Sequence, residues 1–353
     1  MSKRVNLALQ GGGAHGAFAW GVLDRLLEGD EIDIAAISGT SAGALNGAAL
    51  KAGLASAPGR DGRDAARANL NYIWAQVGDV TDNLFVRWMH SLMPTSRHLQ
   101  RWAEAFSPLA WADKLVRNIS PYDFGPFYSN PLAAIIREMP YPVLVGERGP
   151  RLFMTATNVR TGRVRVFADH EITPETVMAS ACLPTVFRAV KIKDTVTGKL
   201  ESYWDGGYTG NPALFPLFEA DLPRDIVVVN INPLVRRELP HTPVEIQDRI
   251  NEISFNASLL SELRAIYFVK RLFAEGRLQG KAMKNVLIHM IMDDKLMNTL
   301  TASTKMLPSP GLLDRMHEAG RKAAVQFLKK SEGKLGHSDS FDLSSIFDMT
   351  PGG

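Results

Sequence analysis

Cysteine is almost absent from this chain of 353 residues. Cys182 is the only one, so no disulfide can form within the chain. A single cysteine is typical of a protein from a reducing compartment, and we expect a cytoplasmic location. The sequence also lacks an apolar run long enough to span a bilayer, and the apolar run after Lys3 and Arg4 is too short for a signal-peptide core. Any membrane contact is therefore expected to be peripheral, at the inner membrane.

A strong excess of charge of one sign is missing as well. The chain has 40 Lys and Arg against 37 Asp and Glu, a net charge of +3. This excess is too small to predict nucleic acid as a partner, although it would tolerate an anionic membrane surface. Hydrophobic residues make up 45% and charged residues 22% of the chain, which is typical of a globular protein with a sizeable core.

The start of the chain predicts strand, loop and helix twice in succession. Residues 5–9 predict a strand, and an apolar-periodic segment from Phe18 to Leu27 predicts a helix after a glycine loop. Residues 32–37 predict a second buried strand, and a run of small residues ending at Gly53 predicts the next helix. Two such units predict a parallel sheet with helices on its faces.

Further strands are expected from β-branched and apolar runs, at residues 151–159 and 163–167 (a hairpin), 186–192, 226–231 and 286–292. The small polar residues 56–69 predict an exposed loop. Residues 70–119 predict a helical insertion that carries four of the six tryptophans. This insertion is either an ordinarily packed cap or a lid or acyl-chain groove that touches a lipid surface.

The character of the sequence changes after residue 236. A capping box from Thr242 to Glu245 predicts the start of a helix whose pattern runs to Gly276. Such a helix would be about 50 Å long if straight, so we expect a bend or break.

A serine between two glycines follows the second predicted strand. Gly39, Ser41 and Gly43 form the pattern G-x-S-x-G where a strand turns sharply into a helix, which is the context that the pattern requires. Such a turn holds a serine hydroxyl in the open on a strained backbone, and bulky neighbours two residues away would clash. The helix start directs unpaired N–H groups toward developing negative charge. This spacing makes Ser41 a candidate nucleophile.

The first glycine loop is open to three interpretations. Gly11, Gly13 and Gly16 match the dinucleotide fingerprint G-x-G-x-x-G after a strand and before a helix. That fingerprint expects an acidic residue at the end of the second strand. The acidic residues here lie at its start: Asp30, Glu31 and Asp33. The alternatives are a plain turn and an oxyanion hole, whose free N–H groups approach a substrate closely. We favour the oxyanion hole because Ser41 is near.

A serine nucleophile needs a base, and the eight histidines offer no obvious one. His289 lies inside a predicted strand, where a satisfied core histidine is the favoured interpretation. His317 lies on the polar face of a helix, where we expect it to be solvated, and His15 lies within the glycine loop. Asp205 is the better candidate, because two glycines keep its surroundings open and a carboxylate can accept the serine proton directly. A plain Asp-Gly-Gly turn remains the alternative.

Three motifs in this order resemble the patatin-like phospholipase family, over about residues 5–235. They are Gly11-Gly12-Gly13-Ala14-His15-Gly16, Gly39-Thr40-Ser41-Ala42-Gly43 and Asp205-Gly206-Gly207. The segments Ala179-Ser180-Ala181-Cys182-Leu183-Pro184 and Asn211-Pro212 also fit. The chain departs from the family where His15 replaces a frequent Lys or Arg, where Cys182 replaces a small Ala, and where Ala189 replaces a frequent Pro. A positive charge at position 15 would therefore depend on pH.

The resemblance implies a three-layer α/β/α fold and a Ser–Asp dyad that works without histidine. Ser41 is then the nucleophile and Asp205 the base. The amides of three successive residues are implied as the oxyanion hole: Gly11, Gly12 and Gly13. Five further glycines are implied as supporting residues: Gly16, Gly39, Gly43, Gly206 and Gly207. No metal and no other cofactor is implied.

The implied activity is serine-dependent hydrolysis of fatty-acyl esters in phospholipids, lysophospholipids or related lipids. Two alternatives stay open, which are an acyltransferase on the same scaffold and a catalytically idle lipid- or nucleotide-binding module. We expect an acyl hydrolase domain at 5–235, a mostly helical extension at 236–330 and a flexible tail at 331–353. The extension could dimerise into a homo-oligomer, cover the acyl channel or respond to a regulator, and the sequence does not separate these roles.

Overall fold

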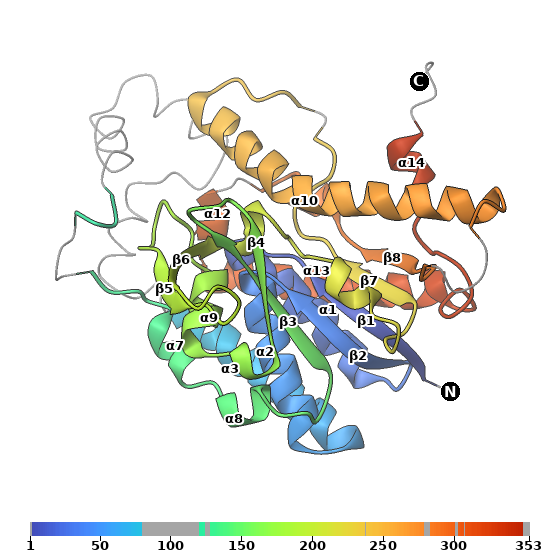
Figure 1. The fold of residues 1–353 in the computed structure, drawn as a ribbon, viewed down its shortest axis with the longest axis horizontal. Helices are drawn as coiled ribbons and strands as arrows, with labels where there is room; N and C mark the ends of the chain where they lie inside the picture. Colours follow the sequence, from blue (N-terminus) through green and yellow to red (C-terminus); the bar gives the residue numbers. More distant parts are fainter. Residues whose placement is uncertain are drawn as a thin grey trace.

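Among the residues that the structure describes, eight strands form one central sheet, in the order β5-β6-β3-β2-β1-β7-β8 with β4 paired to β3 beside this path (Figure 1). The computed structural model describes residues 2–79, 120–123, 128–236, 238–278, 283–300, 303–306 and 308–348. The strands are β1 (Lys3–Leu9), β2 (Ile32–Gly39), β3 (Arg151–Asn158), β4 (Val164–Ala168), β5 (Val190–Lys193), β6 (Leu200–Asp205), β7 (Asp225–Val229) and β8 (Leu287–Ile291). The strands β3, β2, β1, β7 and β8 run parallel, β4 and β6 each pair antiparallel with β3, and β5 pairs antiparallel with β6. The predicted, mainly parallel sheet is confirmed.

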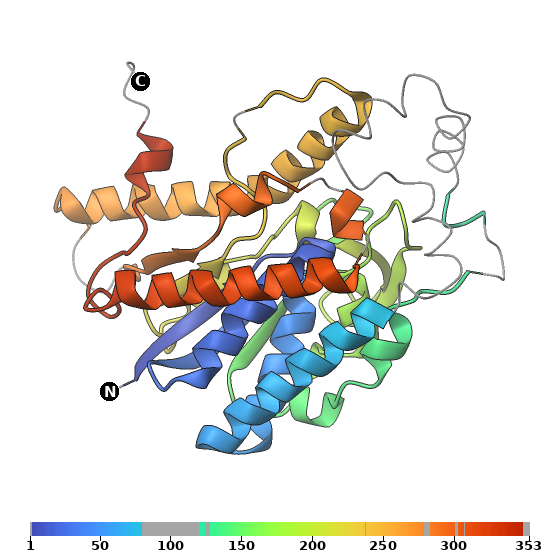
Figure 2. The same cartoon turned by 180° about the vertical axis from the view of Figure 1, so that it is seen from behind.

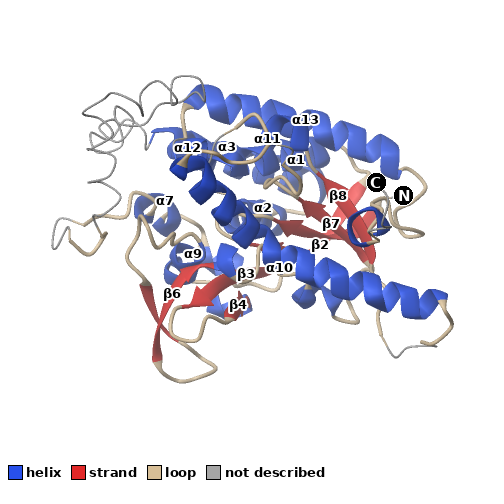
Figure 3. Cartoon of the chain, turned by 90° about the horizontal axis from the view of Figure 1, so that it is seen from above, coloured by secondary structure: helices blue, strands red, loops and turns tan. Residues whose placement is uncertain are grey.

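Helices cover both faces of this sheet. They are α1 (Ala17–Glu28), α2 (Ala42–Ser56), α3 (Gly59–Asp79), α7 (Ala133–Arg137), α8 (Tyr141–Leu144), α9 (Pro174–Ser180), α10 (Pro243–Ala274), α11 (Asp294–Met297), α12 (Ser303–Met306), α13 (Pro310–Ser331) and α14 (Ser344–Phe347). Figure 2 shows α1, α3 and α13 across one face, and Figure 3 shows α10 on the opposite side. Each face buries its own apolar cluster, so the three-layer α/β/α fold is confirmed.

Local signals place several of these elements correctly. The hairpin of β3 and β4 forms as predicted. The capping box that begins α10 is also confirmed, because Thr242 Oγ1 accepts a hydrogen bond from Glu245 N–H and the Glu245 carboxylate accepts one from Thr242 N–H. Figure 1 shows that α10 changes direction along its length, as its 32 residues led us to expect.

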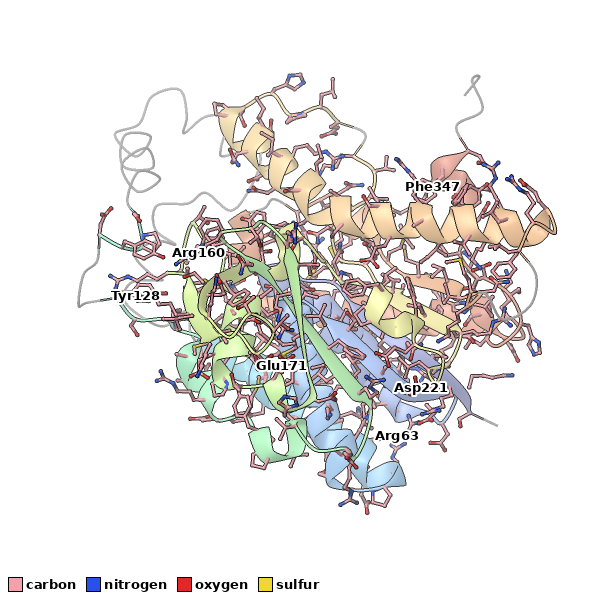
Figure 4. All side chains as sticks on the ribbon, viewed as in Figure 1. Arg63, Tyr128, Arg160, Glu171, Asp221 and Phe347 are labelled. Atoms are coloured by element: carbon pink, nitrogen blue, oxygen red, sulfur yellow. The ribbon has the colours of Figure 1, made fainter. Side chains whose placement is uncertain are left out.

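The exposed loop expected at residues 56–69 is wrong, because α3 begins at Gly59. The glycines and charges there suggested a loop, but apolar side chains recur with helical spacing and are buried against the core at Ala66, Leu70 and Ile73. Arg63, labelled in Figure 4, donates hydrogen bonds to the carbonyls of Gly29 and Ile32 and so fastens the helix to the start of β2. From residue 80 on, the predicted helical insertion lies outside the described residues.

The C-terminal residues differ from the flexible tail that we expected, as far as residue 348. Leu335 and Leu343 are buried. Asp339 accepts a hydrogen bond from the N–H of Ile288 in β8, and Asp225 in β7 accepts one from the N–H of Gly336. This segment therefore packs on the edge of the sheet. Within the described residues, none of the helices combines the length and the apolar character needed to cross a membrane.

Candidate active site

Ser41 lies on the sharp turn between β2, which ends at Gly39, and α2, which begins at Ala42. Its backbone has φ 54° and ψ −122°, a combination that is strained for a residue with a side chain. This is the strand–turn–helix context that the G-x-S-x-G pattern predicts. Only 6% of Ser41 is exposed, so its hydroxyl lies in a site with little access to bulk water.

The pairing of β3 explains why Asp205 lies near Ser41 although 164 residues separate them. Along one edge, β3 pairs with β4 through residues 153–157. The pairings with β2 (151–154) and with β6 (156–158) both overlap that range, so β2 and β6 must share the other edge. Asp205, at the end of β6, therefore lies just beyond the point where β2 ends and the serine turn begins.

The carboxyl group of Asp205 is completely buried. Its Oδ1 accepts a hydrogen bond of 2.7 Å from the N–H of Gly207. Its Oδ2 has no hydrogen-bond partner of ordinary geometry among the described residues, although the Ser41 side chain is close enough to affect the carboxyl. Burial raises the pKa of Asp205 to about 7, and the contacts with Gly207 and Ser41 partly oppose this rise. Such a pKa suits a general base near neutral pH.

The end of α9 and the residues after it hold both members of this pair. Ser180 Oγ accepts a hydrogen bond of 3.0 Å from the N–H of Ser41. The carbonyl of Cys182 accepts one of 2.8 Å from the N–H of Asp205. Cys182 itself is buried, and this burial raises the pKa of its thiol to about 12, so it carries no thiolate at neutral pH.

The glycine loop after β1 lies directly against the serine turn. A Cβ added to Gly11 would lie 2.6 Å from the carbonyl oxygen of Thr40 and 2.7 Å from Ser41 Cβ, so only glycine permits this approach. The N–H of Gly11 is not free, however, because it donates a hydrogen bond of 2.7 Å to Asn211 Oδ1. The expectation that Gly11 supplies an oxyanion donor needs correction for this reason.

The next two amides remain as candidates for the oxyanion hole. Among the described residues, the N–H groups of Gly12 and Gly13 have no hydrogen-bond acceptor. The peptide group between Gly11 and Gly12 is held in place, because the carbonyl of Gly11 accepts hydrogen bonds from Asn232 Nδ2 at 3.0 Å and from Asn211 Nδ2 at 3.3 Å. Gly13 has φ +59°, which favours glycine.

The other motif glycines lie around these groups. Gly16 ends the 3₁₀ helix after the loop, Gly39 ends β2, Gly43 lies in the first turn of α2, and Gly206 and Gly207 begin the 3₁₀ helix after Asp205. Sequence reasoning named Asn211 without a role and missed Ser180 as the acceptor for Ser41. It also missed Asn232, although a polar residue just after the buried strand β7 is a signal for this edge of a parallel sheet.

His289 and His15 are two of the three histidines considered as possible bases. His289 is fully buried as expected, with Nδ1 at 2.9 Å from Ser340 Oγ and Nε2 at 3.0 Å from Asp225. Burial and the charge of Lys305 hold the pKa of His15 well below its usual value, so this residue carries no positive charge at neutral pH.

The expectation that His317 is solvated is wrong. Its ring lies 3.9 Å, centroid to centroid, from Trp20, and its Nε2 lies 3.3 Å from Asp24. Burial alone would raise the pKa of Asp24, but the nearby His317 ring and a hydrogen bond from Arg67 hold it well below its usual value. His317 thus lies between α1 and α13, beside the ion pairs that Asp24 makes with Arg67 and Arg321.

Within the described part of the chain, no group of three His, Cys, Asp or Glu side chains is placed to hold a metal ion. A three-layer α/β/α fold, with a serine on a strained strand-to-helix turn beside a buried carboxylate, is an arrangement suited to acyl transfer through a serine.

Comparison with known proteins identifies the family. The chain belongs to the patatin-like phospholipase family, whose sequence model matches residues 7–220, more than half of the chain. This membership supports lipid hydrolysis as the general activity. Among curated proteins, none matches the sequence significantly.

Two solved structures are similar. The first is VipD from Legionella pneumophila, with 17% identity, a TM-score of 0.41, and coverage of 93% of this chain and 67% of that one. The second is the type III effector protein ExoU, with 17% identity, a TM-score of 0.33, and coverage of 94% of this chain. The chain spans only 54% of the ExoU chain.

Proposed function

We propose that this protein is a serine acyl hydrolase that cleaves fatty-acyl esters of phospholipids, lysophospholipids or related lipids. Ser41 is the nucleophile and Asp205 the base. The N–H groups of Gly12 and Gly13 bind the oxyanion. The observation that carries the proposal is Oδ2 of Asp205, a buried carboxyl atom that has no hydrogen-bond partner among the described residues and lies beside a serine on a strained turn.

In the first half of the reaction, Ser41 Oγ attacks the ester carbonyl carbon while its proton moves to Asp205 Oδ2. The carbonyl oxygen becomes an oxyanion, which accepts hydrogen bonds from the two glycine amides and is favoured by the N-terminus of α2. When the tetrahedral intermediate collapses, Asp205 returns the proton to the leaving alcohol oxygen. The products are the free alcohol and an acyl ester on Ser41.

The second half repeats these steps with water. Asp205 accepts a proton from a water molecule as its oxygen attacks the acyl carbonyl, and the same amides bind the new oxyanion. Collapse releases the fatty acid, and the proton on Asp205 returns to Ser41 Oγ. The raised pKa of Asp205 makes both directions of this proton transfer accessible near neutral pH.

Fatty-acid release from phospholipid vesicles tests this proposal, with wild type, S41A and D205N, each with and without a chelator. We expect release by the wild type that survives the chelator and falls at least about 10³-fold in both variants. Labelling by a fluorophosphonate should occur in the wild type and not in S41A. An active D205N variant would refute the dyad.

Product analysis separates the related reactions. Labelling of Ser41 without fatty-acid release, together with acyl transfer to an added alcohol, would replace the hydrolase with an acyltransferase. Absence of both labelling and release from the wild type would favour an idle lipid-binding module.

A further inference from the structure

The short helix α12 packs against the glycine loop, although it lies outside the residues that the family model matches. A Cβ added to Gly13 would lie only 2.2 Å from the carbonyl oxygen of Lys305. On the same helix, Thr304 Oγ1 lies 2.7 Å from His15 Nε2. Two residues of the loop are therefore in contact with a segment about 290 residues further along the chain.

The side chain of Lys305 reaches the same loop by another route. Its ammonium group donates a hydrogen bond of 2.7 Å to Asn232 Oδ1. An ammonium group can only donate, so this bond requires the oxygen of the Asn232 amide to face Lys305. The amide nitrogen then faces the other way, where it donates to the carbonyl of Gly11 at 3.0 Å.

The carbonyl of Gly11 and the N–H of Gly12 belong to one planar peptide group and point in opposite directions. Whatever holds this carbonyl therefore aims the N–H of Gly12. Asn232 and Asn211 hold it from their amide nitrogens. Asn232 is completely buried, and the N–H of its own backbone is fixed by Gln10 Oε1 at 2.8 Å, so its remaining freedom is rotation of its side chain.

We propose that Lys305 is a positioning residue of the oxyanion hole, which orients Asn232 so that Asn232 holds the Gly11 carbonyl and aims the N–H of Gly12 at the oxyanion. This inference rests on the proposed function. It assigns the C-terminal extension a part in catalysis, because the residue that fixes the loop comes from α12. Burial and the charge of Arg236 lower the pKa of Lys305, and the nearby carboxylate of Glu252 partly opposes this.

The test compares K305M with K295M, a matched loss of a lysine at an exposed position on α11. The readouts are the rate constant for labelling of Ser41 by a fluorophosphonate, and kcat and KM for a soluble p-nitrophenyl ester. We expect K305M to lose about 10- to 100-fold in labelling rate and in kcat, with KM changed less than about twofold, because the oxyanion forms only in the transition state. K295M should match the wild type. Equal rates for K305M and wild type would overturn the proposal.

Substitution of Asn232 gives a second test of the proposal, which remains available if K305M folds poorly. In N232D the side chain keeps its shape and its contact with Lys305. It loses the N–H group that donates a hydrogen bond to the Gly11 carbonyl, so labelling of Ser41 should slow as in K305M. An N232D variant that labels at the wild-type rate overturns the proposal. In the N232A background, K305M should lower the labelling rate by less than about a further twofold. If Lys305 and Asn232 acted independently, the losses of the two single variants would multiply instead. Failure of the proposed function is distinguishable, because the wild type itself would then neither label nor hydrolyse the ester.

Discussion

Ser180 Oγ accepts a hydrogen bond from the backbone N–H of Ser41, at 3.0 Å, across 139 positions of sequence. Two residues further along, the carbonyl of Cys182 accepts the N–H of Asp205 at 2.8 Å. The end of α9 thus fixes the backbone of both residues that we propose for the reaction. Reacting groups must be held to within about an ångström, so such supports contribute to rate as well as to stability.

The first prediction concerns this support. S180A leaves the buried N–H of Ser41 without an acceptor, which should lower the free energy of unfolding by about 1–3 kcal/mol. The freed turn should also slow fluorophosphonate labelling of Ser41 by about tenfold. S261A is the control, since Ser261 is exposed on α10 and, within the described residues, its hydroxyl donates only to the carbonyl of Ala257 in its own helix. Labelling of S180A at the wild-type rate would contradict the prediction.

The second prediction is the pH dependence of activity. Burial raises the pKa of Asp205 to about 7, and only the deprotonated carboxylate can accept the serine proton. The value of kcat/KM for a soluble ester should therefore fall about tenfold for each unit of pH below about 7. A profile between pH 5 and 9, with circular dichroism to confirm folding throughout, measures it. If kcat/KM instead fell near the ordinary pKa of an aspartate, about 4, the base would be exposed or would be another group.

The third prediction is that D205N stabilises the fold while it removes activity. The folded-state pKa of Asp205 lies above its unfolded value, so the wild type loses stability as pH rises from about 4 to about 7. An asparagine carries no charge and escapes this loss. The gain in unfolding free energy of D205N over the wild type should then be about 2.5 kcal/mol larger at about pH 8 than at about pH 5. Chemical denaturation at the two pH values measures this difference, and a gain that does not depend on pH would contradict it.

The sequence predicted what short-range patterns can encode. The strands β1 and β2, the serine turn and the box that caps α10 each depend on residues within a few positions of one another. The approach of Asp205 to Ser41 depends instead on β2 and β6 sharing one edge of β3, which no local pattern states. The order of the three motifs and their resemblance to a family supplied that link.

The parts that sequence reasoning missed are contacts between distant segments. Asn211 Oδ1, 200 positions along the chain, accepts a hydrogen bond from the N–H of Gly11, so the three successive glycines do not supply three free donors. His317 looked solvated on its own helix, yet its partners Trp20 and Asp24 lie on α1. Polar side chains with long-range partners are the ones whose surroundings a helical pattern cannot predict.

The last prediction separates strain from crowding in the glycine loop. Gly13 and Gly162 both have positive φ, at 59° and 65°. A Cβ on Gly162 would meet nothing within 4 Å, whereas one on Gly13 would lie 2.2 Å from the carbonyl oxygen of Lys305. Both G13A and G162A should lose about 1–2 kcal/mol of unfolding free energy from the left-handed backbone.

Only G13A should displace the loop, and labelling of Ser41 should therefore fall by about 100-fold or more in G13A and stay at the wild-type rate in G162A. Chemical denaturation and fluorophosphonate labelling measure the two effects in the same pair of proteins. A G13A variant that is destabilised as much as G162A but labels normally would mean that the N–H of Gly13 does not face the reacting oxygen, and the oxyanion hole would then need a donor other than Gly13.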